Sequence, residues 1–170
     1  QETKVKDEEF PKNIFDEIGY GVIFHGQPSY NGVAIAYKKT SFENPTQILN
    51  NMPSFKDKQS RLNAGLFKHK KTGTPIRMIC VYVPNGSEIG SEKFLYKLNW
   101  FKHLLDMIEE ERKFFKKICI LGDFNVAPTD LDVHDPEKWN DKILCSPEER
   151  TLFQELLEKD FFDSFRFIFE

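Results

Sequence analysis

Two short, mainly apolar runs restrict the fold of this 170-residue chain more than any other feature. Residues 75–83 and residues 117–121 show no polar alternation, which is typical of strands buried on both faces. The first run leads into the turn-forming sequence PNG at 84–86, and the second leads into GDFN at 122–125. Because functional residues often follow buried strands directly, we examine the polar side chains at these two strand ends.

The remaining elements predict sheets covered by helices. Residues 21–25 and 33–37 predict a hairpin around a turn at 27–32, and residues 61–68 predict a further strand. Residues 91–112 predict an amphipathic helix, because apolar residues recur at steps of three and four. Its start is marked by the capping residue Ser91. A second helix is predicted from Ser146 by a capping box with proline at the first helical position. This mixture indicates an α/β (α+β) fold.

The composition is that of a globular domain. Hydrophobic residues make up 39% of the chain and charged residues 30%, without a linker or repeat, so one continuous domain is expected. The 17 phenylalanines predict a large, well-filled core. No apolar run is long enough to span a bilayer, and no signal peptide is visible. The chain does not begin with methionine, so we expect an interior start.

Cysteine content and charge give weaker constraints. The three cysteines form no CxxC pair, and Cys80 and Cys119 lie inside apolar runs, which predicts buried free thiols. The net charge of −3 counts mildly against a nucleic-acid partner. It does not exclude one, because acidic metal ligands with a bound cation would reverse the local field.

The two strand ends carry candidate chemistry. Asp123 and Asn125 are two residues apart, so in an extended chain their side chains point to the same face. The carboxylate can hold a hard cation or accept a proton, and the amide can donate to a phosphate oxygen. An Asx-turn without function is the alternative. Tyr82 and Asn85 could equally be ordinary core-boundary and turn residues, and Glu2 alone is uninformative.

Five segments in order resemble one protein family. They are QETK (1–4), HGQPSYNGVAIAYK (25–38), VYVPNGSEIGSEKFLYKLNW (81–100), LGDFNVAPTDLDVHDPEKW (121–139) and SPEER (146–150). Together they resemble the exonuclease III and abasic-site (AP) endonuclease family of the endonuclease/exonuclease/phosphatase superfamily. The resemblance implies a two-sheet sandwich flanked by helices, the DNase I-like fold. Residues 1–170 would form a single, incomplete catalytic domain truncated at both ends.

The resemblance also implies a function. A family member would be a DNA-repair hydrolase that depends on Mg²⁺, with Mn²⁺ possible. It would cut 5′ to abasic sites and remove nucleotides 3′→5′ from duplex DNA. Its partner would be duplex DNA with abasic sites or 3′ ends, and no membrane. The full-length protein would be a monomer in the bacterial cytoplasm, associated with the nucleoid.

The roles of site residues follow from the same resemblance. Glu2 matches a glutamate that ligates Mg²⁺, and Asp123 matches the catalytic aspartate, assigned either to water activation or to leaving-group protonation. Asn125 matches an asparagine that bonds this aspartate and the phosphate, and we assign both Asp123 and Asn125 to the metal site as well. Tyr82 matches a tyrosine that contacts the scissile phosphate in catalysis.

The remaining two matches concern DNA binding. Asn85 matches an asparagine that contacts the phosphate, and Arg61 is similar to an arginine on the DNA backbone. The family's N-terminal metal-site asparagine and C-terminal Asp-His pair have no match here. His134, which lies beside acidic residues, is expected to be a surface residue and not a substitute for the missing histidine.

Three alternatives remain at this point. A phosphatase of the same superfamily, acting on small or lipid phosphates, would need the same metal site. A DNA-binding module without catalysis would bind duplex DNA and not cut it with any metal. A truncated gene product would have neither activity.

We expect residues 1–170 alone to be nearly inactive, because loss of members of a catalytic unit costs several orders of magnitude in rate. Incision of an abasic-site duplex with Mg²⁺ measures this. Turnover equal to that of a complete family member would refute it.

We also expect residues 1–170 alone to self-associate, because missing strands would leave exposed apolar surface and unpaired strand edges. Light scattering tests this expectation. A compact, stable monomer would count against it.

Overall fold

A computed structural model describes residues 1–169 as two compact units. The first unit contains Gln1–Tyr82 and Glu110–Phe124, and the second contains Val83–Glu109 and Asn125 onward. The chain therefore passes between units at residues 82–83, 109–110 and 124–125, and the first and last of these crossings are the two predicted strand ends. That residues 1–170 form a single, incomplete catalytic domain stays a prediction. Within residues 1–169, no helix is both long and apolar enough to cross a membrane.

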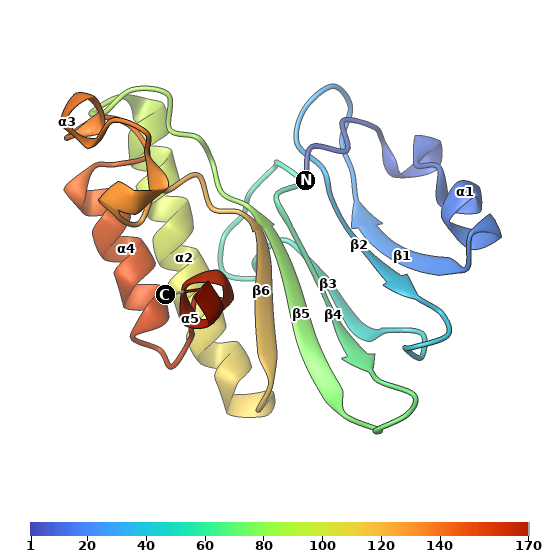
Figure 1. The fold of residues 1–170 in the computed structure, drawn as a ribbon. Coiled ribbons are helices and arrows are strands. Elements are labelled where there is room, and N and C mark those ends of the chain that lie inside the picture. Colours follow the sequence, from blue (N-terminus) through green and yellow to red (C-terminus); the bar gives the residue numbers. More distant parts are fainter. Residues whose placement is uncertain (170) are drawn as a thin grey trace. The chain divides into compact units, whose positions relative to one another are not determined.

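The first unit opens with a short helical segment and the predicted hairpin (Figure 1). The 3₁₀ helix η1 (Asp7–Glu9) and α1 (Lys12–Glu17) precede β1 (Tyr20–His25) and β2 (Val33–Lys38). β1 and β2 pair antiparallel, with Val22 opposite Ala36. The predicted hairpin is confirmed.

The second sheet of this unit has four strands in the order β3-β4-β5-β6 (Figure 1). They are β3 (Thr46–Asn50), β4 (Leu62–Lys68), β5 (Pro75–Tyr82) and β6 (Ile118–Asp123). The first three are antiparallel neighbours, whereas β6 runs parallel to β5. Parallel neighbours need a long connection, and the segment between β5 and β6 contains the longest helix of the chain.

The core of the first unit lies between its two sheets. Buried side chains of β1, β2, β4 and β5 form one cluster: Ile23, Val33, Ile35, Tyr37, Phe67 and Cys80. Phe67 has no exposed surface and packs edge-on against the Tyr37 ring, with 5.4 Å between centroids. The predicted two-sheet α/β arrangement with helices is therefore confirmed.

The second unit is helical. It contains most of α2 (Glu92–Phe114), then η2 (Asp130–Asp132), α3 (Pro136–Trp139), α4 (Pro147–Leu157) and α5 (Ser164–Phe169). Both predicted helix starts are confirmed: the Ser91 hydroxyl accepts the Phe94 N–H, and Ser146 and Glu149 form a reciprocal capping box. The buried face of α2 carries Trp100, Phe101 and Leu104, and α4 buries Leu152.

Two burial predictions were wrong. β6 is only half buried, because it is the last strand of its sheet and has a strand neighbour on one side alone. Cys119 on this strand is consequently exposed, whereas Cys80 and Cys145 are buried.

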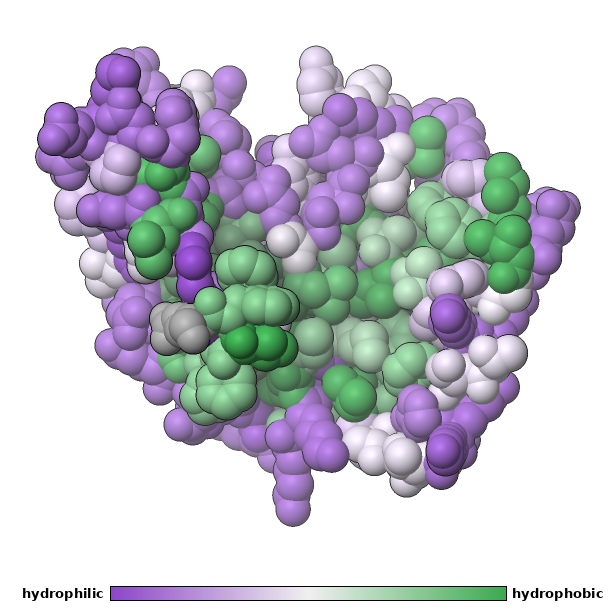
Figure 2. All heavy atoms as spheres, in the orientation of Figure 1, coloured by the Kyte–Doolittle hydropathy of each residue, from purple (hydrophilic) through white to green (hydrophobic). Residues whose placement is uncertain are grey.

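The core is also smaller than the 17 phenylalanines predicted. Several aromatic side chains are more than half exposed, and Figure 2 shows apolar residues gathered on the surface over α5. The phenylalanines among them are Phe114, Phe162, Phe165, Phe167 and Phe169. Whether residues 1–170 alone self-associate stays a prediction.

Phe67→Ala should lower the free energy of unfolding by about 3–5 kcal/mol, because it leaves a cavity between the two sheets. Phe114→Ala is the matched control, since that ring is 78% exposed and its removal leaves no cavity. Urea unfolding measures both. Equal stability losses in the two variants would contradict the described core.

Candidate active site

The ends of β5 and β6 bring two predicted site residues together. Tyr82 is the last residue of β5, Asp123 is the last residue of β6, and the two are register partners in the parallel pair. Paired residues on neighbouring strands carry their side chains on the same face of the sheet. A phenol and a carboxylate therefore stand side by side at the carboxyl edge.

Glu2 reaches the same edge through the turn of the β1–β2 hairpin. The N–H groups of Thr3 and Lys4 donate to the carbonyls of Gly32 and Asn31, at 3.2 and 3.0 Å. Gly32 has a φ of +85°, and a Cβ there would lie 2.0 Å from the Thr3 hydroxyl. Only glycine allows the N-terminal segment to approach this closely.

A hydrogen bond joins Glu2 to the strand end. The Tyr82 hydroxyl donates to Glu2 Oε1 at 2.8 Å, and the Lys4 ammonium lies 2.5 Å from Glu2 Oε2. Arg61 stacks its guanidinium on the Tyr82 ring, 4.9 Å from the centroid, and donates to the Tyr82 carbonyl at 3.2 Å. Gln59 Oε1 holds the guanidinium through two hydrogen bonds.

These contacts shift two pKa values in opposite directions. Hydrogen bonds from Lys4 and then Tyr82 hold the pKa of the Glu2 carboxyl below its ordinary 4.5. Burial, followed by the bond to Glu2, raises the pKa of Tyr82 above its ordinary 10.0. At neutral pH Glu2 is therefore an anion and Tyr82 is a neutral hydrogen-bond donor.

The other two predicted residues meet in the second unit. Asn85 Nδ2 donates to Asn125 Oδ1 at 3.3 Å, and Asn125 Nδ2 donates to the Val83 carbonyl at 2.8 Å. Asn125 has a φ of +48°, so its backbone is left-handed and not extended. Asn125 therefore lacks the extended conformation on which the predicted shared face of Asp123 and Asn125 depends.

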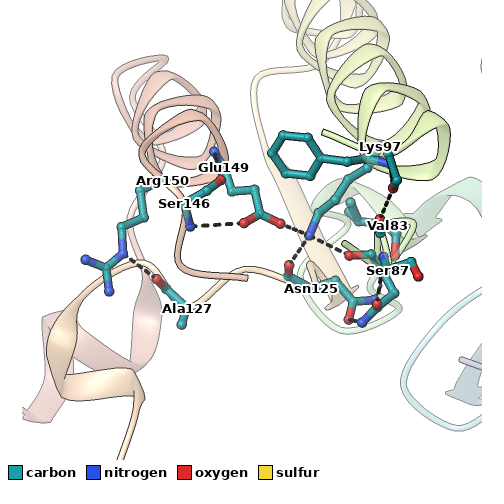
Figure 3. Close-up of polar contacts among 12 residues, drawn as sticks. Val83, Ser87, Lys97, Asn125, Ala127, Ser146, Glu149 and Arg150 are labelled. Atoms are coloured by element: carbon teal, nitrogen blue, oxygen red, sulfur yellow. Dashed lines mark hydrogen bonds and ion pairs between the residues drawn. The ribbon is translucent and has the colours of Figure 1, made fainter. Parts of the chain in front are cut away.

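A buried lysine, which sequence reasoning missed, supports both asparagines (Figure 3). Lys97 Nζ donates to the carbonyls of Asn85 and Asn125 and forms an ion pair with Glu149. Both charged side chains are almost completely buried. One signal was available in the sequence: Lys97 lies three residues after Phe94 and four before Phe101, on the apolar stripe of α2.

The part of the chain that the structure describes contains no group of three or more His, Cys, Asp or Glu side chains placed to hold a metal ion. Mg²⁺, however, commonly binds one or two carboxylates, with waters and substrate phosphates completing its shell. Glu2 already attracts the Lys4 ammonium and is partly exposed, and Asp123 is exposed. Their oxygen donors therefore fit a cation site of this open kind.

The structure thus groups the predicted residues within each unit. Glu2, Arg61, Tyr82 and Asp123 belong to the first unit, and Asn85 and Asn125 belong to the second. His134, predicted to be a surface residue, is exposed.

Comparison with solved structures first defines the fold class. The chain superposes on an AP endonuclease from Archaeoglobus fulgidus with a TM-score of 0.83 at 35% identity, covering 97% of this chain and 60% of that one. The 3′ phosphatase NExo from Neisseria, solved with a product DNA hairpin, also gives 0.83, at 37% identity, and covers 92% and 58%. The fold is therefore that of AP endonucleases, as predicted.

Sequence comparison then gives the relatives. The chain is 33% identical over 177 aligned residues to exodeoxyribonuclease III of Haemophilus influenzae, covering 98% of this chain and 63% of that protein. The predicted resemblance to the exonuclease III and AP endonuclease proteins is confirmed. No family model matches the chain. The chain spans less than two thirds of the length of these three proteins.

The Tyr82–Glu2 hydrogen bond should persist over a wide pH range. Its contribution to stability is lost as pH falls through the lowered pKa of Glu2, below 4.5, and as pH rises through the raised pKa of Tyr82, above 10.0. Ultraviolet absorbance is recorded against pH for the parent and for Tyr82→Phe. The difference between the two curves gives the ionisation of the Tyr82 phenol alone. We expect a midpoint above 10.0, which Glu2→Gln lowers.

Glu155→Gln on α4 is the control for that titration, because Glu155 is exposed and lies in the other unit. A Tyr82 midpoint at or below the ordinary value, or one that Glu2→Gln leaves unchanged, would contradict the described contact.

Proposed function

We propose that the full-length protein is a DNA-repair phosphodiesterase that cuts duplex DNA 5′ to abasic sites and removes nucleotides from 3′ ends. The observation that carries this proposal is the pairing of Tyr82 with Asp123 at the ends of parallel strands, with Glu2 bonded to Tyr82. It is supported by relatives named exodeoxyribonuclease III and AP endonuclease.

Phosphodiester hydrolysis needs groups that stabilise negative charge and groups that move a proton. Charge develops on the non-bridging oxygens and on the leaving 3′ oxygen. We assign Tyr82 to the non-bridging oxygens, because its raised pKa keeps the hydroxyl protonated as a donor. We assign Asp123 to the proton, either taken from water or given to the leaving oxygen.

We assign the amides of Asn85 and Asn125 to the phosphate as neutral donors. Their side chains are already bonded to each other, and Asn125 is also bonded to Val83. They are thus preorganised, so little reorganisation is needed when charge develops. Arg61, held by Gln59, is assigned to the DNA backbone, where a guanidinium binds phosphate well.

Glu2 and Asp123 supply oxygen donors that would hold Mg²⁺ or Mn²⁺, and the assignment of Asn125 to the metal rests on the family resemblance alone. When bound, such an ion offsets phosphate charge and orients the substrate. Glu2, ionised at neutral pH, can bind the ion without losing a proton. Lys4 would have to leave Glu2 Oε2, since both cations compete for that oxygen.

A second activity, removal of a terminal 3′ phosphate from DNA, is favoured by one comparison. The relative NExo is described as a 3′ phosphatase and was solved with a product DNA hairpin. The same donors would serve both reactions, because each one breaks a bond to a phosphoryl group at a DNA 3′ oxygen. From the family resemblance we also propose that the full-length protein is a monomer in the bacterial cytoplasm, associated with the nucleoid.

The test is a side-by-side assay of the full-length protein on four substrates: abasic-site duplex, recessed 3′ ends, a 3′-phosphate duplex and a phosphoinositide. We expect cleavage of the DNA substrates with Mg²⁺ and none with chelator. Asp123→Asn should reduce abasic-site incision at least about 100-fold, because it removes the proton-transfer group.

Glu155→Gln should leave incision unchanged. Preference for the phosphoinositide, or DNA binding without cleavage under Mg²⁺ or Mn²⁺, would overturn the proposal.

A further inference from the structure

Lys97 is the most deeply buried cation of the second unit, with 1% of its side chain exposed. Its ammonium has three N–H donors and bonds to acceptors on two loops and on α4 (Figure 3). The acceptors are the Asn85 carbonyl at 3.1 Å, the Asn125 carbonyl at 2.6 Å and Glu149 Oε1. One side chain on α2 therefore ties together two loops and the start of α4.

Two of these acceptors are main-chain oxygens of the proposed phosphate-binding residues. Fixing the Asn85 and Asn125 carbonyls fixes the backbone from which each amide side chain projects. Asn125 has a left-handed φ of +48°, a conformation that asparagine adopts more readily than most other residues, and the bond from Lys97 holds its carbonyl in place. Gly86 lets the loop approach: a Cβ there would lie 2.9 Å from Lys97 Cδ and from Ile143 Cδ1.

Glu149 supplies the charge that makes a buried ammonium tolerable. Its carboxylate has no exposed surface, and Oε2 accepts the Ser146 N–H at 3.1 Å as part of the α4 capping box. The capping box therefore holds the carboxylate that holds Lys97. Burying such a pair seldom adds net stability compared with apolar residues of similar volume, so its presence is better explained by what it orients.

We propose that Lys97, backed by Glu149, is a positioning residue that sets the loops of Asn85 and Asn125 for phosphate binding. This inference rests on the proposed function, because it assigns the two amides to the DNA phosphate. The two amides are assigned to a phosphate on which charge grows in the transition state, so misplacing them should lower kcat more than it weakens DNA binding.

The deciding variant of the full-length protein is Lys97→Met/Glu149→Gln. This variant leaves no unpaired buried charge. Methionine fills the space of the aliphatic part of the lysine side chain, and glutamine can still accept the Ser146 N–H in the capping box. The protein should therefore remain folded while both carbonyls lose their donor. We expect kcat for abasic-site incision to fall about 100-fold with KM for the duplex little changed, because small misplacements of binding groups cost this much.

Glu149→Gln alone is the second variant, and it keeps the lysine donors on both carbonyls. Its kcat should lie between those of the parent and the double variant. Arg77→Met/Glu111→Gln is the matched control, because Arg77 and Glu111 form another largely buried ion pair, and Arg77 donates to the carbonyl of Gln47. Its kcat per folded molecule should equal that of the parent.

Side-chain amide signals of Asn85 and Asn125 in nitrogen-15 NMR spectra give a readout independent of activity. They should shift in the double variant and not in the Arg77→Met/Glu111→Gln control. Unshifted signals, parental kcat in a folded double variant, or equal kcat losses in the control would overturn the positioning role. If the double variant shifts these amide signals as expected but the parent protein cuts no DNA, the proposed function alone is refuted.

Discussion

The parallel pairing of β5 with β6 is the constraint from which the candidate site follows. In-register pairing puts Tyr82 and Asp123 side by side at the carboxyl edge of the sheet. Gly122 is required at this register: with its φ of +138°, a Cβ would lie 2.0 Å from the carbonyl oxygen of Val81 on the neighbouring strand. Displacing either strand by one residue would turn one of the two side chains to the opposite face.

The charged residues around Glu2 and those around Lys97 differ in how exposed they are. Around Glu2 the groups are partly exposed, and the ionised carboxylate can exchange the Lys4 ammonium for another cation. Around Lys97 the charges are buried and paired, so they cannot serve as ligands and instead hold backbone. An acidic protein with a net charge of −3 can thus present a site for an anionic substrate.

Local patterns predicted the hairpin, β4, β5 and the starts of α2 and α4, because each depends on neighbouring residues. β3 was not predicted: it is largely exposed and interrupted at Gln47, whose φ is +49°. Lys97 was missed because a lysine on an apolar stripe does not reveal its partner 52 positions away. The Glu2–Tyr82 bond, across 80 positions, is likewise invisible to periodicity, and only the family resemblance linked the two residues.

Paramagnetic broadening by Mn²⁺ tests most directly whether the end of β5 and β6, with Glu2, is a cation-assisted phosphate site. Trace Mn²⁺ is added to the isotope-labelled full-length protein, and backbone amide signals are followed. We predict that the signals of Glu2, Tyr82 and Asp123 broaden first and that Glu2→Gln abolishes the effect. Uniform broadening, or broadening centred on other acidic residues such as Asp130 and Asp132, would contradict it.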